Sequence, residues 1–362
     1  MVRSLSSLVI LVAFASHALA QPADQPPPPP PDQPPVAEPT PEPTPAPVPA
    51  VTATPDLTPA AALERLPDSA VPDVKHPTAS IAIVGGMYIT FSSWAYLAWY
   101  VKHKPLSYYK WGGDGWLGSR TYAGGADKFG HAWATMNLAR AGTAILSDFG
   151  GYDHFKSSLI STALSETLFF FVEVKDGFFY EFSPSDLTGD TVGAIMALLF
   201  DNIPKLDEMF DYRVQYFPSK EYWDNVAGSN NYGRLNIAED YSGETYLLAY
   251  HLGSIHSLRE QPVIGTLSRF VDLTAGFDSR GYKPSPPAGY PDNAHHQNMF
   301  IGVSFNAQGF FDWVFEGHTS SKAKTARKIT HGLFEIFNLP FTSAPILQHS
   351  TSPTGTVTMD GA

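Results

Sequence analysis

The sequence has no cysteine and few charged side chains, and its net charge is negative. The absence of cysteine excludes disulfides, thiolate metal sites, cysteine nucleophiles and a lipidated amino-terminal cysteine. A formal charge of −12 argues against a nucleic-acid partner, because phosphate binding needs clustered lysine and arginine. No Walker loop, Gly-x-Ser-x-Gly elbow or His-Glu-x-x-His motif occurs, which disfavours the common nucleotide and hydrolase chemistries.

The amino-terminal 77 residues have the composition of an exported leader followed by a linker. Arg3, the apolar stretch 8–14 and the small residues at 18–20 predict a signal peptide over 1–20. Residues 22–59 hold more than half of the prolines, so 21–77 is expected to be a Pro-rich disordered linker. We therefore expect an exported cell-envelope protein on the periplasmic face of a membrane, with the outer membrane as the predicted location.

Residues 78–215 predict a bundle of about four helices. Turn residues separate four apolar segments, at about 79–101, 127–146, 155–174 and 184–200. The first carries no charge over about twenty-three residues, so it is the best candidate for a membrane helix, with a core helix of a peripheral protein as the alternative. The fold is expected to be mainly α, with the bundle membrane-embedded or membrane-associated.

Residues 216–343 change character and predict a smaller antiparallel β part. Apolar side chains alternate with polar or small ones in 270–277 and again in 300–307, which is the pattern of two paired strands. A final amphipathic helix is expected at about 323–337, and 344–362 is expected to be a flexible tail.

Ionisable residues interrupt three of the four apolar helices at helical spacing. Asp127 and His131 lie four residues apart, as do Asp186 and Asp190, and Glu173 lies in the segment between these pairs. Burying several carboxylates together requires a counter-charge. Two sources remain open, namely a divalent metal ion held by these five residues, or the protein's own cations, Lys128, Arg140 and Lys175.

The same segment resembles a known family. The strings Asp127-Lys128-x-x-His131, Glu173-x-x-Asp176 and Ser183-x-x-Asp186-Leu187-x-x-Asp190-x-x-Gly193 are similar to the motif of the YfiM-type predicted periplasmic lipoproteins of unknown function. They resemble the VanZ-like membrane family more distantly, where Gln and Asn stand at the positions of Asp176 and Asp190. The resemblance covers about 124–199 and implies an envelope protein with a helical bundle. The VanZ-like similarity implies a link to glycopeptide-antibiotic response, and neither family implies a reaction.

Two hypotheses of function follow. In the first, the protein is a non-enzymatic envelope component whose buried acidic and histidine cluster binds a lipid head group or an envelope protein. In the alternative, it is a metal-dependent hydrolase or transferase acting on a lipid or phosphate ester, with His131, Asp127 and Glu173 in catalytic roles. Side-chain ligand atoms within about 5 Å of one point would favour the metal site, and carboxylates paired with lysine or arginine would favour the first hypothesis.

Overall fold

The computed structural model describes residues 74–112, 115–224, 236–284 and 295–352. The predicted signal peptide, nearly all of the predicted linker and the end of the predicted tail lie outside the described residues. The description below concerns the compact unit that contains 75–362.

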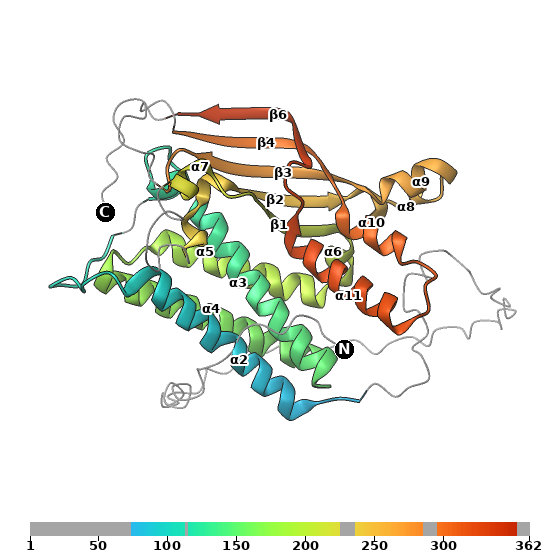
Figure 1. Ribbon diagram of the computed structural model, residues 1–362, viewed down its shortest axis with the longest axis horizontal. Helices are drawn as coiled ribbons and strands as arrows, with labels where there is room; N and C mark the ends of the chain where they lie inside the picture. Colours follow the sequence, from blue (N-terminus) through green and yellow to red (C-terminus); the bar gives the residue numbers. More distant parts are fainter. Residues whose placement is uncertain (1–73, 113–114, 225–235, 285–294, 353–362) are drawn as a thin grey trace, which may run out of the picture. The chain divides into compact units, whose positions relative to one another are not determined.

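Four long helices follow one another in the first half of the chain (Figure 1). They are α2 (Pro77–Ala95, continued by a π-helical turn over Tyr96–Tyr100), α3 (Ala126–Ala144), α4 (His154–Phe179) and α5 (Pro184–Asn202). The starts of α4 and α5 are set locally, because the side chain of Asp153 accepts from the Lys156 amide and that of Ser183 from the Asp186 amide. The four predicted segments are confirmed as helices.

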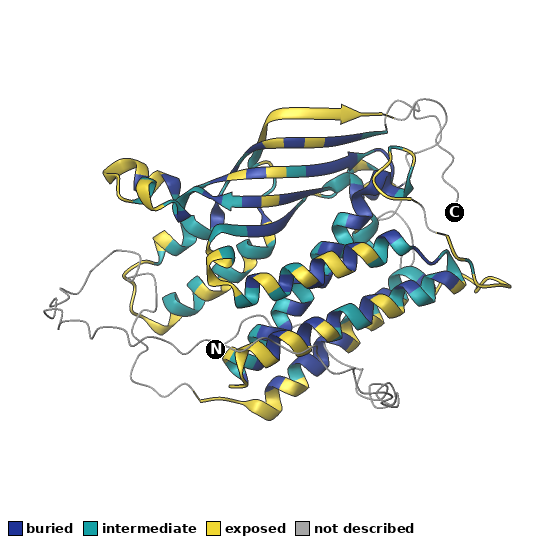
Figure 2. Ribbon diagram, turned by 180° about the vertical axis from the view of Figure 1, so that it is seen from behind, coloured by how far each residue is buried: buried dark blue, intermediate teal, exposed yellow. Residues whose placement is uncertain are grey.

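Two of these helices could cross a membrane by length and composition alone. They are α2 with its π-helical continuation and α4. Figure 2 shows exposed residues running along the outer side of the long helices, on the side away from the sheet.

Shorter helices bring the total to ten among the residues that the structure describes. The additional ones are α6 (Pro204–Met209), α7 (Lys220–Tyr222), α8 (His256–Arg259), α9 (Pro262–Ser268), α10 (Ala307–Val314) and α11 (Ser321–Ile336). The helix predicted at about 323–337 is α11, while the other five are too short to show a helical period in the sequence. The protein is mainly helical, as expected.

A six-stranded sheet forms the β part. Its strands are β1 (Phe210–Tyr216), β2 (Glu244–His251), β3 (Val271–Arg280), β4 (His296–Phe305), β5 (Phe337–Asn338) and β6 (Ser343–Thr351), in the order β5-β1-β2-β3-β4-β6. The predicted pair is confirmed as β3 and β4, antiparallel with Leu273 opposite Val303. The sheet is mixed rather than antiparallel throughout, because β5 runs parallel to β1.

The sheet extends beyond the boundaries expected for it at both ends. β1 begins at Phe210, inside the range 78–215 assigned to the helical bundle, and β6 occupies 343–351, most of it in the expected flexible tail. The reason is pairing across a long sequence distance: β1 bonds to β2 and β6 bonds to β4. Local composition cannot reveal such partners.

The sheet curls so that the first residue of β6 comes close to β1, near the opposite end of the strand order. β5 and β6 follow each other in the chain, yet they lie at opposite ends of the strand order. In a flat sheet five strand spacings would separate them by about 24 Å, whereas the five steps from Asn338 to Ser343 reach only about 18 Å. The Gln215 side-chain oxygen in β1 accepts from both Asn338 Nδ2 at 3.2 Å and Ser343 Oγ at 3.1 Å, so the two edges are in contact.

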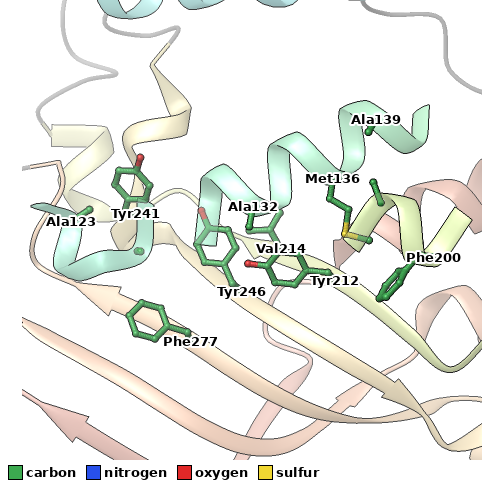
Figure 3. Close-up of a cluster of buried hydrophobic side chains, with 12 residues drawn as sticks. Ala123, Ala132, Met136, Ala139, Phe200, Tyr212, Val214, Tyr241, Tyr246 and Phe277 are labelled. Carbon is green, nitrogen blue, oxygen red and sulfur yellow. The ribbon is translucent and has the colours of Figure 1, made fainter. Parts of the chain in front are cut away.

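The outward face of the curled sheet packs on α3. Tyr212 and Val214 of β1, Tyr246 of β2 and Phe277 of β3 form one buried cluster with α3 residues such as Met136 (Figure 3). Because side chains alternate across a strand, the residues between these point into the curl. Helix α5 also lies against the sheet, because its Ala197 and Phe200 belong to the same cluster.

The inward face holds a group of buried charges, which we call the sheet charge cluster: Asp211, Arg213, His251 and Asp272. Arg213 donates to Asp211 and, at 2.7 Å, to Asp272. His251 contacts the same two carboxylates, with Nε2 at 3.1 Å from Asp211 and Nδ1 at 2.7 Å from Asp272. Two cations thus balance two anions where water is excluded, which is the condition under which buried charges are tolerated.

Candidate metal centre

Tight backbone packing places α3 and α5 side by side. A Cβ atom added at Gly189 would lie 2.7 Å from the Lys128 carbonyl oxygen, and one added at Gly193 would lie 2.2 Å from the Ala132 carbonyl oxygen. The two glycines therefore allow the helix backbones to touch. Asp190 lies between them in sequence, on the side of α5 that faces α3.

Replacing Gly193 by alanine should consequently destabilise the protein. The new methyl group meets backbone atoms of Ala132, which cannot rotate away, so we expect a loss of about 1–3 kcal/mol in the free energy of unfolding. Gly332 in α11 is the matched control, because nothing lies within 4 Å of its added Cβ. Gly332→Ala should gain about 0.5–1 kcal/mol from helix propensity. Denaturant unfolding of both variants tests the pair, and equal effects would contradict close α3–α5 contact as the cause.

Three of the predicted site residues converge, one from each of three helices. His131 on α3, Glu173 on α4 and Asp190 on α5 each offer a ligand atom, and these atoms lie within 4.8 Å of one another. His131 Nδ1 is 3.0 Å from Asp190 Oδ1 and 3.9 Å from Glu173 Oε1. We call these three residues the triad.

Neighbouring groups fix the two carboxylates in place. Thr135 Oγ1, one turn after His131 on α3, donates to Asp190 Oδ1 at 2.8 Å. The Ser183 amide, at the start of α5, donates to Glu173 Oε2 at 3.2 Å. Thr135 was not predicted, although its spacing of four residues from His131 is a signal that could have found it.

Each carboxylate also keeps one oxygen without a hydrogen-bond partner. These atoms are Asp190 Oδ2 and Glu173 Oε1, both inaccessible to water and both on side chains no more than 1% exposed. A buried carboxylate oxygen that accepts no hydrogen bond carries a large desolvation cost. The His131 side chain is 19% exposed, so the triad has one route to the surface.

Asp127 and Asp186 do not join the triad. Lys128 Nζ lies 2.8 Å from Asp127 Oδ2 and 2.8 Å from Asp186 Oδ1. The lysine therefore supplies the counter-charge for these two carboxylates. The five-residue metal site expected from the sequence divides into a lysine-bridged pair and the triad.

The other two predicted counter-charges lie elsewhere. Arg140 pairs with Asp201, Asp207 and Glu335 at the far end of α3. The Lys175 ammonium lies over the ring of Tyr100, 3.9 Å from its centroid. Among the described residues, Lys128 is the one predicted cation that contacts carboxylates of the candidate site.

The electrostatics of His131 reflect its acidic surroundings. Burial, the largest influence, acts to lower the pKa of His131, but the carboxylates of Asp190, Asp186 and Glu173 together outweigh it. The pKa of His131 is therefore raised well above its usual range. The imidazole stays cationic at neutral pH when no other cation is bound, which balances one of the two carboxylates of the triad.

One family model matches this part of the chain. Residues 113–202 match the family described as "Predicted periplasmic lipoprotein (DUF2279)", which covers the triad and the lysine-bridged pair. The match is consistent with the expected place in the cell envelope, and it leaves the YfiM-type assignment and the VanZ-like similarity as predictions. No curated protein and no solved structure matches the chain. The segment is thus similar to a periplasmic family without an assigned activity.

Proposed function

We propose that the protein is a cell-envelope protein that binds one divalent cation through His131, Glu173 and Asp190. The supporting observation is the pair of buried, unpartnered oxygens, Glu173 Oε1 and Asp190 Oδ2, beside the His131 imidazole. One nitrogen and two carboxylate oxygens are a donor set suited to Zn²⁺ or Mn²⁺. The ion would take the place of the proton that a buried carboxyl group otherwise keeps.

Burial favours a small ion over the larger ligands considered from the sequence. Glu173 and Asp190 are 1% and 0% exposed, so a lipid head group or a partner protein cannot reach these carboxylates without opening the bundle. A single ion can enter beside His131. We therefore place the cation ahead of a lipid head group or an envelope protein as the ligand of this cluster.

Metal analysis of two glutamate-to-glutamine variants on the same helix tests the proposal. Purified mature protein is equilibrated with Zn²⁺ or Mn²⁺, dialysed and analysed by elemental mass spectrometry, and about one ion per chain is expected. Glu173→Gln should lower the affinity by roughly 100-fold or more, because even outer residues of metal sites contribute 10–100-fold. Glu166→Gln is the control, since Glu166 lies two turns earlier on α4 and bonds to Thr191 instead.

A third variant separates the triad from the lysine-bridged pair. Asp127→Asn should retain the ion, because Asp127 pairs with Lys128 rather than with the triad. Folded wild-type protein without stoichiometric metal, or equal loss in Glu166→Gln, would refute the proposal.

A second candidate function is metal-dependent hydrolysis of a phosphate ester. It is favoured by the number of ligands, because three protein ligands leave a coordination position for water or substrate, as in catalytic sites. A substrate would meet the bound ion from the partly exposed His131 side, without contacting the two buried carboxylates. Metal-loaded protein should then cleave a chromogenic phosphate ester and Glu173→Gln should not. Metal binding without turnover would leave the non-enzymatic role.

A further inference from the structure

The polarity of α4 is reversed relative to a helix on a water-soluble protein. The side that faces the bundle carries buried hydroxyl residues, including Ser158, Ser161 and Ser165. The outer side carries exposed aliphatic and aromatic residues: Leu159 44%, Ile160 53%, Phe170 41% and Phe171 46%. A surface helix in water normally places its polar side outward and its apolar side inward.

Helix α5 continues the same arrangement. Gly189, Asp190, Gly193 and Ala197 are buried, while the exposed large residues are Val192, Ile195 and Leu199. Between 157 and 202, each residue of the exposed class is apolar or a threonine, and none is charged. We call this surface of α4 and α5 the aliphatic face.

From these observations we infer that the aliphatic face is immersed in the hydrocarbon of a lipid bilayer. α4 alone, with 26 residues, is about 39 Å long, and a protein partner covering such a length would normally meet polar groups at its rim. Lipid chains need none. Small and hydroxyl-bearing residues between helices, with bulky apolar ones outside, are what helices packed within lipid require.

The aromatic residues at one end of α2 and α4 support lipid as the occupant. The loop after α2 is held to the end of α4 by bonds from the Leu106 amide to the Phe178 carbonyl and from the Lys110 amide to the Gly177 carbonyl. Exposed tyrosine and tryptophan side chains gather there: Tyr96, Tyr108, Tyr109, Trp111 and Trp116. These two residue types are enriched where a bilayer meets water.

The absence of cysteine makes a direct test clean, because each introduced cysteine is the single labelling site. Leu159→Cys, Phe171→Cys and Ile195→Cys, each labelled with the polarity-sensitive fluorophore NBD, are reconstituted into phosphatidylethanolamine and phosphatidylglycerol vesicles. Lys205→Cys on α6 is the control, since the Lys205 side chain is 62% exposed. Circular dichroism confirms that each labelled variant is folded.

We expect blue-shifted NBD emission at the three face positions, with strong quenching by doxyl-labelled lipids and weak quenching by aqueous iodide. The Lys205 position should show the reverse. Face positions that resemble the control in either quencher would overturn the inference. A measurement on the unaltered chain checks it without any variant: brominated lipids should quench the native tryptophans, and unchanged fluorescence would equally overturn the inference. Neither readout depends on the cation.

Discussion

Replacing Arg213 by methionine is expected to lower the free energy of unfolding by about 3–5 kcal/mol, the range for removing one partner of a buried ion pair. Arg213 is 1% exposed and donates to both Asp211 and Asp272 inside the curled sheet. Methionine replaces the aliphatic part of the arginine side chain, so the loss would come mainly from two carboxylates left without their main cation. Denaturant unfolding followed by circular dichroism measures it.

An exposed ion pair provides the control for this substitution. Lys205 and Glu208 pair at 3.2 Å with side chains 62% and 45% exposed, so Lys205→Met should change stability by less than about 1 kcal/mol. Adding Asp272→Asn to Arg213→Met should restore part of the loss, because it removes one of the stranded charges. A similar, small effect in both lysine and arginine variants would show that the sheet charge cluster is not a major source of stability.

The second large effect is a pH dependence that originates in His251. Burial, the largest influence, acts to lower the pKa of His251, but Asp211 and Asp272 raise it to about 9. A folded-state pKa above the usual 6.5 means that the proton stabilises the fold fully below pH 6.5 and that this contribution disappears as the pH rises through 9. The loss amounts to about 3 kcal/mol across that window.

Comparison with His251→Gln isolates this contribution. The variant should be less stable than the wild type near pH 6, and the difference should vanish towards pH 9. The pH dependence of wild-type stability alone does not identify His251 as the source. Burial raises the pKa of Glu244 to about 8, and the ionisation of that group also lowers stability as the pH rises. Unfolding curves at several pH values measure the difference, and parallel profiles for the two proteins would rule out His251 as its source.

The triad was accessible to sequence reasoning because its members stand at helical spacing in apolar segments. His131, Glu173 and Asp190 each interrupt a run that had to be a buried helix, so their side chains were expected to meet. The sequence could not predict that Asp127 and Asp186 would lie outside the triad. Their position depends on the Lys128 side chain reaching both carboxylates, and helical periodicity does not specify where a long side chain turns.

The sheet shows a different limit of prediction from sequence. Alternation in β1 between Tyr212 or Val214 and Asp211 or Arg213 correctly indicates two faces. Charge alone would assign the face with Asp211 and Arg213 to solvent, yet that face points into the curl and is buried. Which face is inside depends on contacts such as the one between Gln215 of β1 and Ser343 of β6, which lie more than a hundred residues apart in the chain. No local pattern reports such a closure.

The way the two ends of the sheet are joined also bears on the order of events during biogenesis. Strands β1 to β4 are synthesised before β6, which is the last strand in the described chain. β6 pairs with β4, and its first residue lies beside Gln215 of β1. Until residues 343–351 have been delivered, β4 offers unpaired amide and carbonyl groups to any neighbouring polypeptide. Chains truncated before Ser343 by proteolysis or premature termination should therefore self-associate more than those cut after Thr351, because the edge that β6 presents carries Pro345 and a break in register.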